Sequence, residues 1–140
     1  MTKLLLKSAA FFSIFTIASM TFATEPLSRP LTNKVSVTGQ MSIDKFQQLM
    51  KDGYKSVIVN RPDQEPGNAV SVSQLRSIAE KSQVSVIYQP VISGQITQQN
   101  ISEFAKYYNE LPKPILMVCR GGTRSAALFN QAKAQGLIHE

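Results

Sequence analysis

Cys119 and Arg124 are the residues of this sequence whose types and spacing could do chemistry. Four residues separate them, and two of these four are glycines, in the segment Cys-Arg-Gly-Gly-Thr-Arg-Ser. Cys119 is also the only cysteine in the chain. A thiolate is a strong nucleophile, and a guanidinium can hold an oxyanion through two parallel hydrogen bonds. The pair therefore predicts a nucleophile beside a binding site for phosphate or another oxyanion.

The flanking sequence predicts that this segment is the turn between a buried strand and a helix. Apolar residues 115–118 precede it, and residues 125–135, which contain no glycine and no β-branched residue, follow it. Gly121 and Gly122 allow the backbone to direct several N–H groups toward an anion. The dipole of the following helix adds positive potential at the same point. We expect this environment to favour the thiolate form of Cys119.

The turn supplies most of the predicted site residues. Cys119 is the predicted nucleophile and Arg124 the predicted anion clamp. Ser125 is expected to donate a hydrogen bond to the thiolate or to cap the helix. The other residues of the turn are predicted to bind substrate, with the first pointing outward: Arg120, Gly121, Gly122 and Thr123. A lone cysteine at a strand end is more often a small buried apolar residue, but these neighbours favour catalysis or oxyanion binding.

Three more apolar segments precede this strand and alternate with helical patterns. Strands are predicted at residues 34–37, 55–60, 84–88 and 115–118, and helices at 42–53, 70–81, 97–110 and 125–135. This alternation indicates an α/β fold, with a mostly parallel central sheet of about four strands and helices on both faces. Ligands of such sheets bind beyond the carboxyl ends of the strands. We therefore expect Arg61, Asp63 and residues 91–95 to lie beside the Cys119 turn.

Arg61 and Asp63 are the candidate site residues outside the turn. Arg61 is expected to provide a second contact to the anion. A phosphatase needs a general acid, and Asp63 or Glu65 is the nearest substitute because residues 92–95 contain no acid. The competing interpretation is that both carboxylates are solvated turn residues and that Arg61 pairs with Asp63 at the surface.

The turn resembles the active loops of two families. Cys-x4-Arg followed by Ser-Ala-Ala is similar to the loop of rhodanese-type sulfurtransferases, and it resembles the Cys-x5-Arg loop of protein tyrosine and dual-specificity phosphatases. With residues 35–40 and 56–63, it resembles the phosphatase-like domain of the β-lactamase-hydrolase-like proteins, over about residues 31–135. The resemblance implies a dual-specificity-phosphatase-like domain at residues 34–140, and hydrolysis through a covalent intermediate on Cys119.

Two departures from the phosphatase pattern leave other functions open. The loop is one residue shorter than Cys-x5-Arg, and no acid follows the third strand. A persulfide on Cys119 needs less room than a phosphate, and sulfur transfer needs no general acid. A rhodanese-like sulfurtransferase is therefore the alternative, and a non-catalytic domain that binds an oxyanion is the second alternative.

Residues 1–23 have the pattern of a secretory signal peptide. Lys3 and Lys7 precede an uncharged apolar run, and Ala23 is a small residue suited to cleavage. The run is short for a membrane span, so we expect a periplasmic or secreted protein with no stable membrane anchor. Residues 24–33 then form an exposed lead-in. A lone thiol in an oxidising compartment needs protection, so a thiol reductant is a candidate partner.

Charge and composition restrict the classes of ligand. Removing residues 1–23 takes away two lysines and lowers the net charge from +6 to +4, which suits a small anionic substrate. Basic residues are scattered, and no run of them indicates nucleic acid. The sequence contains no cluster with metal-ligand spacing and no nucleotide motif, so no metal and no cofactor are predicted.

Overall fold

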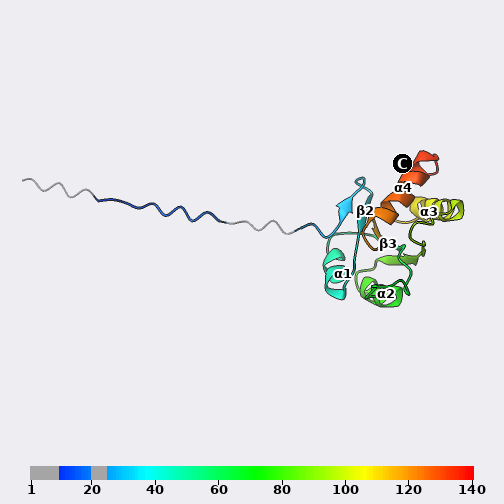
Figure 1. Ribbon diagram of the computed structural model, residues 1–140, viewed down its shortest axis with the longest axis horizontal. Coiled ribbons are helices and arrows are strands. Elements are labelled where there is room, and N and C mark those ends of the chain that lie inside the picture. The colour runs from blue at the N-terminus through cyan, green and yellow to red at the C-terminus, as the bar shows by residue number, and fades with distance from the viewer. Residues whose placement is uncertain (1–9, 20–24) are drawn as a thin grey trace, which may run out of the picture.

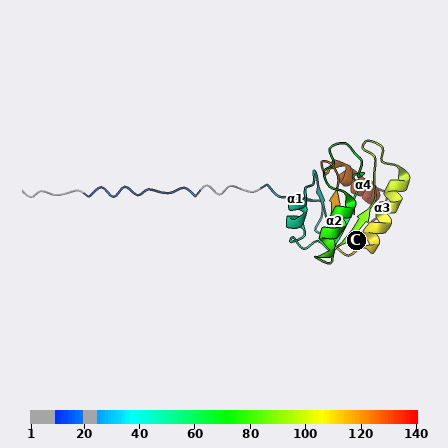
Figure 2. The same ribbon diagram turned by 90° about the horizontal axis from the view of Figure 1, so that it is seen from below.

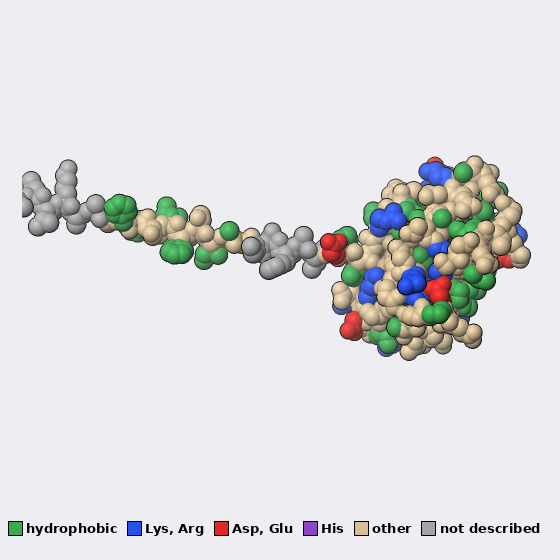
Figure 3. Space-filling view, viewed as in Figure 1, with side chains coloured by type: hydrophobic (Ala, Val, Ile, Leu, Met, Phe, Trp, Pro, Cys, Tyr) green, Lys and Arg blue, Asp and Glu red, His purple; other side chains and the backbone are tan. Residues whose placement is uncertain are grey.

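The computed structural model describes residues 10–19 and 25–140. Lys3, Lys7 and the predicted cleavage site after Ala23 therefore lie outside the described residues. Residues 10–19 form no helix or strand, and their large apolar side chains are exposed (Figure 3). Among the helices that the structure describes, none combines the length and the apolar character needed to cross a membrane.

The described part of the chain forms five strands and four helices, and strands and helices alternate from β2 onward (Figure 1). The strands are β1 (Arg29–Pro30), β2 (Val35–Thr38), β3 (Ser56–Val59), β4 (Ser85–Tyr88) and β5 (Ile115–Val118). The helices are α1 (Ile43–Leu49), α2 (Val72–Glu80), α3 (Gln98–Glu110) and α4 (Thr123–Ala134). The sheet order is β1-β2-β5-β3-β4, and every pairing except β1 with β2 is parallel. The predicted α/β class with a mostly parallel sheet is confirmed.

The predicted lead-in differs from the structure because part of it belongs to the sheet. β1 pairs antiparallel with β2 and adds a fifth, edge strand to the four that were predicted. The Thr38 hydroxyl donates to the Leu27 carbonyl at 2.7 Å, and the hydroxyls of Ser28 and Tyr54 lie 2.8 Å apart. These contacts fasten residues 27–30 to the domain.

The helices cover both faces of the sheet, as predicted. α1 and α2 lie on one face, and α3 and α4 lie on the other (Figures 1 and 2). Alternate residues of β5 serve the two faces: Leu116 and Val118 join the core under α1 and α2, whereas Ile115 and Met117 join the core under α3 and α4. A strand buried on both faces explains the uninterrupted apolar run that precedes Cys119.

The start of α4 differs from the starts of the other three described helices. Ser42, Ser71 and Thr97 cap α1, α2 and α3 with their side chains. The N-cap of α4 is Gly122, which has a φ of 85° and offers no side-chain hydrogen bond. The first N–H groups of a helix have no partner within the helix, so those of α4 are available to a ligand.

Candidate active site

Cys119 lies directly after β5, at the edge of the sheet where the carboxyl ends of the parallel strands meet. Its backbone N–H donates to the Thr38 carbonyl at 3.2 Å, and its Sγ accepts the Gly122 N–H at 3.0 Å. Only 1% of Cys119 is exposed. A hollow of about 350 Å³ lies over it, lined by Ser93, Cys119, Arg120, Gly121, Thr123 and Arg124. The hollow thus joins the predicted nucleophile to most of the predicted substrate-binding residues.

Two glycines set the shape of the turn. The φ of 85° at Gly122 is in the region that other residues rarely adopt, and it turns the N–H of this residue toward Cys119 Sγ. Gly39, which follows β2, pairs with Gly121 across a β-bridge. A Cβ atom on Gly39 would lie only 2.9 Å from the Arg120 carbonyl oxygen. Gly39 therefore allows the end of β2 to approach the turn.

The Arg124 guanidinium is buried at the wall of this hollow, with 7% of its side chain exposed. Its Nη1 donates to the Val91 carbonyl at 2.9 Å, and its Nη2 donates to Glu65 Oε1 at 2.7 Å. Its Nε–H is buried and has no hydrogen-bond partner among the residues that the structure describes. A buried donor without a partner costs about 1–3 kcal/mol, so this N–H indicates a place for an acceptor that a ligand would supply.

Arg61 is not free to bind an anion, and its predicted role in substrate binding is wrong. The residue is 3% exposed. Its Nη1 donates to Gln40 Oε1 at 2.6 Å and its Nη2 to the Pro66 carbonyl at 3.0 Å. Its Nε lies 2.7 Å from Glu65 Oε2, as an ion pair without hydrogen-bond alignment. Arg61 is therefore part of the support around Glu65.

Asp63, the predicted proton donor, has a structural role. Its Oδ1 accepts the Val72 N–H at the start of α2 at 2.8 Å, and its backbone N–H donates to the Tyr88 hydroxyl at 2.9 Å. Its side chain borders a different hollow, lined by Pro62, Asp63, Gln64, Tyr88, Pro90 and Ile92. The assignment of Asp63 as general acid is therefore corrected, because its carboxylate fixes the loop between β3 and α2.

Ser125 neither contacts the thiol nor caps α4, contrary to both predicted roles. Its Oγ donates to Asn60 Oδ1 at 2.8 Å, and Asn60 Nδ2 donates to the Gln89 carbonyl at 3.1 Å. Ser125 and Asn60 are completely buried. This chain of hydrogen bonds joins the segments that follow β3, β4 and β5, so Ser125 positions the helix rather than the nucleophile.

The predicted meeting of three segments at this edge is confirmed, but the residues that join them were mostly missed. Glu65 and the Val91 carbonyl hold Arg124, and Asn60 holds Ser125. Asn60 gave a usable signal, since a polar residue directly after a buried strand often faces the ligand edge. No signal in the sequence indicated that Glu65 pairs with Arg124, because the turn-forming residues around Glu65 are equally typical of a solvated loop.

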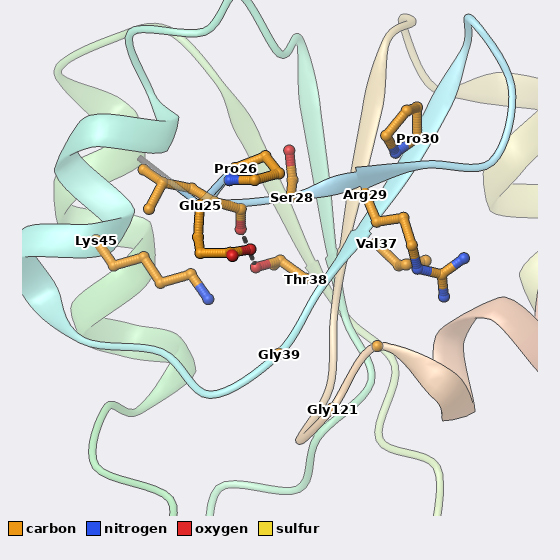
Figure 4. Close-up of a pocket in the computed structure, with 12 residues that line it drawn as sticks. Glu25, Pro26, Ser28, Arg29, Pro30, Val37, Thr38, Gly39, Lys45 and Gly121 are labelled. Carbon is orange, nitrogen blue, oxygen red and sulfur yellow. Dashed lines mark hydrogen bonds between the residues drawn. The ribbon is translucent and has the colours of Figure 1, made fainter. Parts of the chain in front are cut away.

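A second hollow, of about 410 Å³, adjoins the turn on the side of β2 (Figure 4). It lies under residues 25–30 and reaches Gly121 and Gly122, but Cys119 does not line it. Lys45 and Arg29 approach it from opposite sides (Figure 4). Burial lowers the pKa of Lys45, whose Nζ donates to the Gln40 carbonyl at 3.0 Å.

No metal centre is evident on the part of the chain that the structure describes. Within residues 10–19 and 25–140, no group of three or more His, Cys, Asp or Glu side chains could hold a metal ion. Lys and Arg side chains lie in several separate places on the face shown in Figure 3. The basic side chains that line the hollow over Cys119 are those of Arg120 and Arg124.

The sheet, its helices and the Cys-x4-Arg turn define an α/β protein with a phosphatase-like fold. Residues 28–136 match the family model of the β-lactamase hydrolase-like protein phosphatase-like domain. The chain belongs to this family, as the resemblance of its motifs predicted.

Curated relatives and solved structures agree with this assignment. The β-lactamase hydrolase-like protein of Agrobacterium fabrum (strain C58) is 30% identical over 99 residues, which are 71% of this chain and 23% of the relative. Its counterpart from Xylella fastidiosa (strain Temecula1) is 27% identical over 99 residues, with the same coverage of 71% and 23%. The chain thus spans less than a quarter of the length of these relatives.

Among solved structures, nma1982 of Neisseria meningitidis Z2491, which has been proposed to be a phosphatase, has a TM-score of 0.72 and 25% identity. That match covers 79% of this chain and 78% of the other. The catalytic core of the PP-IP phosphatase SIW14 from S. cerevisiae has a TM-score of 0.54 and 12% identity, over 78% of this chain and 75% of the other. The second likeness concerns the fold alone.

Proposed function

We propose that this protein is a cysteine-dependent phosphatase that forms a phosphocysteine intermediate on Cys119. The observation that carries the proposal is the Arg124 Nε–H, which is buried and without a partner beside the hollow over Cys119. The uncapped first turn of α4 adds backbone donors at the same place. Donors that converge beside a nucleophile can stabilise the charge that develops on a phosphoryl group in the transition state.

The reaction would proceed in two displacements at phosphorus. The Cys119 thiolate, stabilised by the Gly122 N–H, attacks the phosphorus and forms the S–P bond while the bond to the leaving oxygen breaks. Arg124 and the first N–H groups of α4 hold the three remaining phosphoryl oxygens. Water then attacks the phosphorus, the S–P bond breaks, and phosphate and the thiol are released.

The covalent intermediate gives the direct test. Intact-protein mass spectrometry, after rapid mixing with 4-nitrophenyl phosphate and acid quenching, should detect one added phosphoryl group, and peptide mapping should place it on Cys119. The Cys119→Ser variant should release no nitrophenol and carry no adduct. Unchanged hydrolysis by that variant would refute the proposal. If phosphate protected Cys119 from alkylation but neither turnover nor an adduct were observed, the protein would instead be an oxyanion-binding domain.

A rhodanese-like sulfurtransferase is the second candidate, and one observation favours it. Among the described residues, those that line the hollow over Cys119 include no carboxylate and no imidazole. Attack of the Cys119 thiolate on the outer sulfur of thiosulfate forms a persulfide and expels sulfite, which needs no protonation. Thiosulfate should then add one sulfur atom to the protein, and cyanide should remove it as thiocyanate. Absence of this adduct on an intact thiol would eliminate the candidate.

We also propose that the chain is exported and processed after Ala23. The proposal rests on Lys3, Lys7 and the apolar run that follows them. N-terminal sequencing of the protein from fractionated cells should begin at Thr24, in the periplasm or the medium. A protein that retains Met1 would contradict processing. In an oxidising compartment, activity should then depend on a thiol reductant that keeps Cys119 reduced.

A further inference from the structure

The contacts of Glu65 and Asp63 bear on which substrates the Cys119 site can cleave. When a phosphate ester is cleaved, the leaving oxygen acquires negative charge. An alcohol leaves readily only if a general acid protonates it, and such a proton donor contributes about 10²–10⁴-fold to the rate. A leaving group that is stable as an anion needs no such donor.

Glu65 faces two guanidinium groups rather than the hollow over Cys119. Its Oε1 lies 2.7 Å from Arg124 Nη2 and its Oε2 lies 2.7 Å from Arg61 Nε. Both oxygens thus face guanidinium groups, and a guanidinium keeps its protons in proteins. The carboxylate is therefore directed at Arg124 and Arg61, and Glu65 does not line the hollow over Cys119.

Asp63 is engaged at another site. Its Oδ1 accepts the Val72 N–H at the start of the nine-residue helix α2, where the helix dipole favours a negative charge. The hollow that Asp63 borders is lined on its other sides by Tyr88, Pro90 and Ile92, and Cys119 is not part of it.

The hollow over Cys119 offers only groups that are poor proton donors. Within the described part of the chain, its side chains other than the thiol are those of Ser93, Arg120, Thr123 and Arg124. Hydroxyl groups and guanidinium groups hold their protons too tightly to act as general acids near neutral pH. The site therefore favours leaving groups that depart as stable anions.

We propose that the substrates are phosphoanhydrides, acyl phosphates or phosphates of acidic phenols, and that phosphates of ordinary alcohols are not. This proposal rests on the proposed phosphatase function and names its substrate class. The thiolate of Cys119 attacks the phosphorus, and the electron pair of the breaking P–O bond leaves on a phosphate, carboxylate or phenolate oxygen. Water then cleaves the S–P bond, gives one proton to the cysteine sulfur and leaves hydrogen phosphate.

The test measures kcat/KM against leaving group for the wild-type protein. The substrates are acetyl phosphate, 4-nitrophenyl phosphate, phenyl phosphate and phosphoserine. Phenol has a pKa of about 10, and the alcohol of serine holds its proton far more tightly, about as tightly as water does. We expect phosphoserine to be cleaved at least about a hundredfold more slowly than 4-nitrophenyl phosphate, in line with the missing contribution of a general acid. If hydrolysis of the phosphocysteine is slower than the departure of nitrophenolate, a burst of nitrophenol equal to the enzyme concentration accompanies the reaction.

Asp63→Asn is the matched variant. The amide oxygen of asparagine can still accept the Val72 N–H, so the loop is preserved. The ratio of the phosphoserine rate to the nitrophenyl phosphate rate should stay within about threefold of the wild-type ratio, since a donor that contributes 10²–10⁴-fold would change it far more. A drop of that size in the ratio would overturn the proposal and restore Asp63 as the acid.

The outcomes separate this proposal from the function on which it rests. Cys119-dependent cleavage of phosphoserine within about tenfold of nitrophenyl phosphate would overturn the restriction on leaving groups, and would leave the phosphatase function standing. Failure of every substrate to react in a Cys119-dependent way would overturn the phosphatase function, and the restriction with it.

Discussion

Glu65 and Arg124 form a buried ion pair that ties the loop after β3 to the turn after β5. Glu65 Oε1 lies 2.7 Å from Arg124 Nη2, and the two side chains are 15% and 7% exposed. The other carboxylate oxygen faces Arg61, which is itself bound to Gln40 and Pro66. The orientation of the predicted anion clamp is therefore determined by residues of a distant segment.

Glu65→Gln should weaken both the fold and anion binding. The substitution keeps the size of the side chain but leaves two buried guanidinium groups without a countercharge, and breaking a buried pair costs about 3–5 kcal/mol. Urea denaturation should show this loss in the free energy of unfolding, and phosphate should protect Cys119 from alkylation less well.

Glu80→Gln is the control for this change. Glu80 is the exposed last residue of α2, and an exposed substitution of this kind should change the free energy of unfolding by less than about 0.5 kcal/mol. If both variants unfolded at the same urea concentration as the wild type, the Glu65–Arg124 pair would have no structural role.

Gly39→Ala should displace the turn that holds Cys119. The added Cβ would lie 2.9 Å from the Arg120 carbonyl oxygen and 3.1 Å from the Gly121 Cα, and relief of such contacts requires backbone movement. Overpacking of this kind costs about 1–3 kcal/mol. Differential scanning calorimetry should show a lower melting temperature, with slower alkylation of Cys119 if the hollow closes.

Gly121→Ala is the matched control, because it replaces the other glycine of the bridge between Gly39 and Gly121. A Cβ on Gly121 would meet nothing within 4 Å, and its φ is not positive. The variant should be as stable as the wild type, or slightly more stable because alanine restricts the unfolded chain. Equal destabilisation by both substitutions would show that the bridge between these residues, rather than the steric contact, is responsible.

The fold could be predicted from the sequence because its signals are local. Ser42, Ser71 and Thr97 mark three helix starts, and all three act as caps. The short apolar runs in the sequence correctly predicted the four parallel strands. β1 was missed because a two-residue edge strand containing Pro30 has no periodicity and is formed only by pairing with β2.

The site could be predicted only where its residues are consecutive. Cys119 and Arg124 share one turn, so their proximity follows from the sequence, and both border the same hollow. The roles of Arg61, Asp63 and Ser125 depend on partners 4 to 65 residues away. A polar residue at the ligand edge can face the ligand or a neighbouring loop, and only the three-dimensional arrangement distinguishes these cases.

Ser125→Ala should destabilise the domain through its partner. The fully buried Asn60 amide oxygen would lose the hydrogen bond that Ser125 donates to it, and leaving a buried acceptor unsatisfied costs about 1–3 kcal/mol. Ser77→Ala is the control, because the Ser77 hydroxyl donates to the Ser73 carbonyl on the exposed side of α2. Urea midpoints that fell equally in both variants would contradict a special role for the Ser125–Asn60 bond.

Arg124→Lys should impair oxyanion binding even though it keeps the charge. The guanidinium donates to Glu65 and to the Val91 carbonyl while its Nε–H remains for a ligand, and an ammonium group cannot reproduce this planar arrangement. Loss of the charge-assisted hydrogen bond from Nε, worth about 1.5–3 kcal/mol, should weaken phosphate binding by at least about tenfold.

Arg120→Lys is the matched comparison within the same turn. Arg120 is exposed at the rim of the hollow, where a lysine can keep most of its interaction with an anion. The dissociation constant of phosphate, measured by protection of Cys119 from iodoacetamide, should rise by less than about tenfold, as expected for a charge exposed to solvent. Circular dichroism should show that both variants are folded. If the two substitutions weakened phosphate binding equally, the anion would be held by charge alone, and the assignment of Arg124 as the clamp would be wrong.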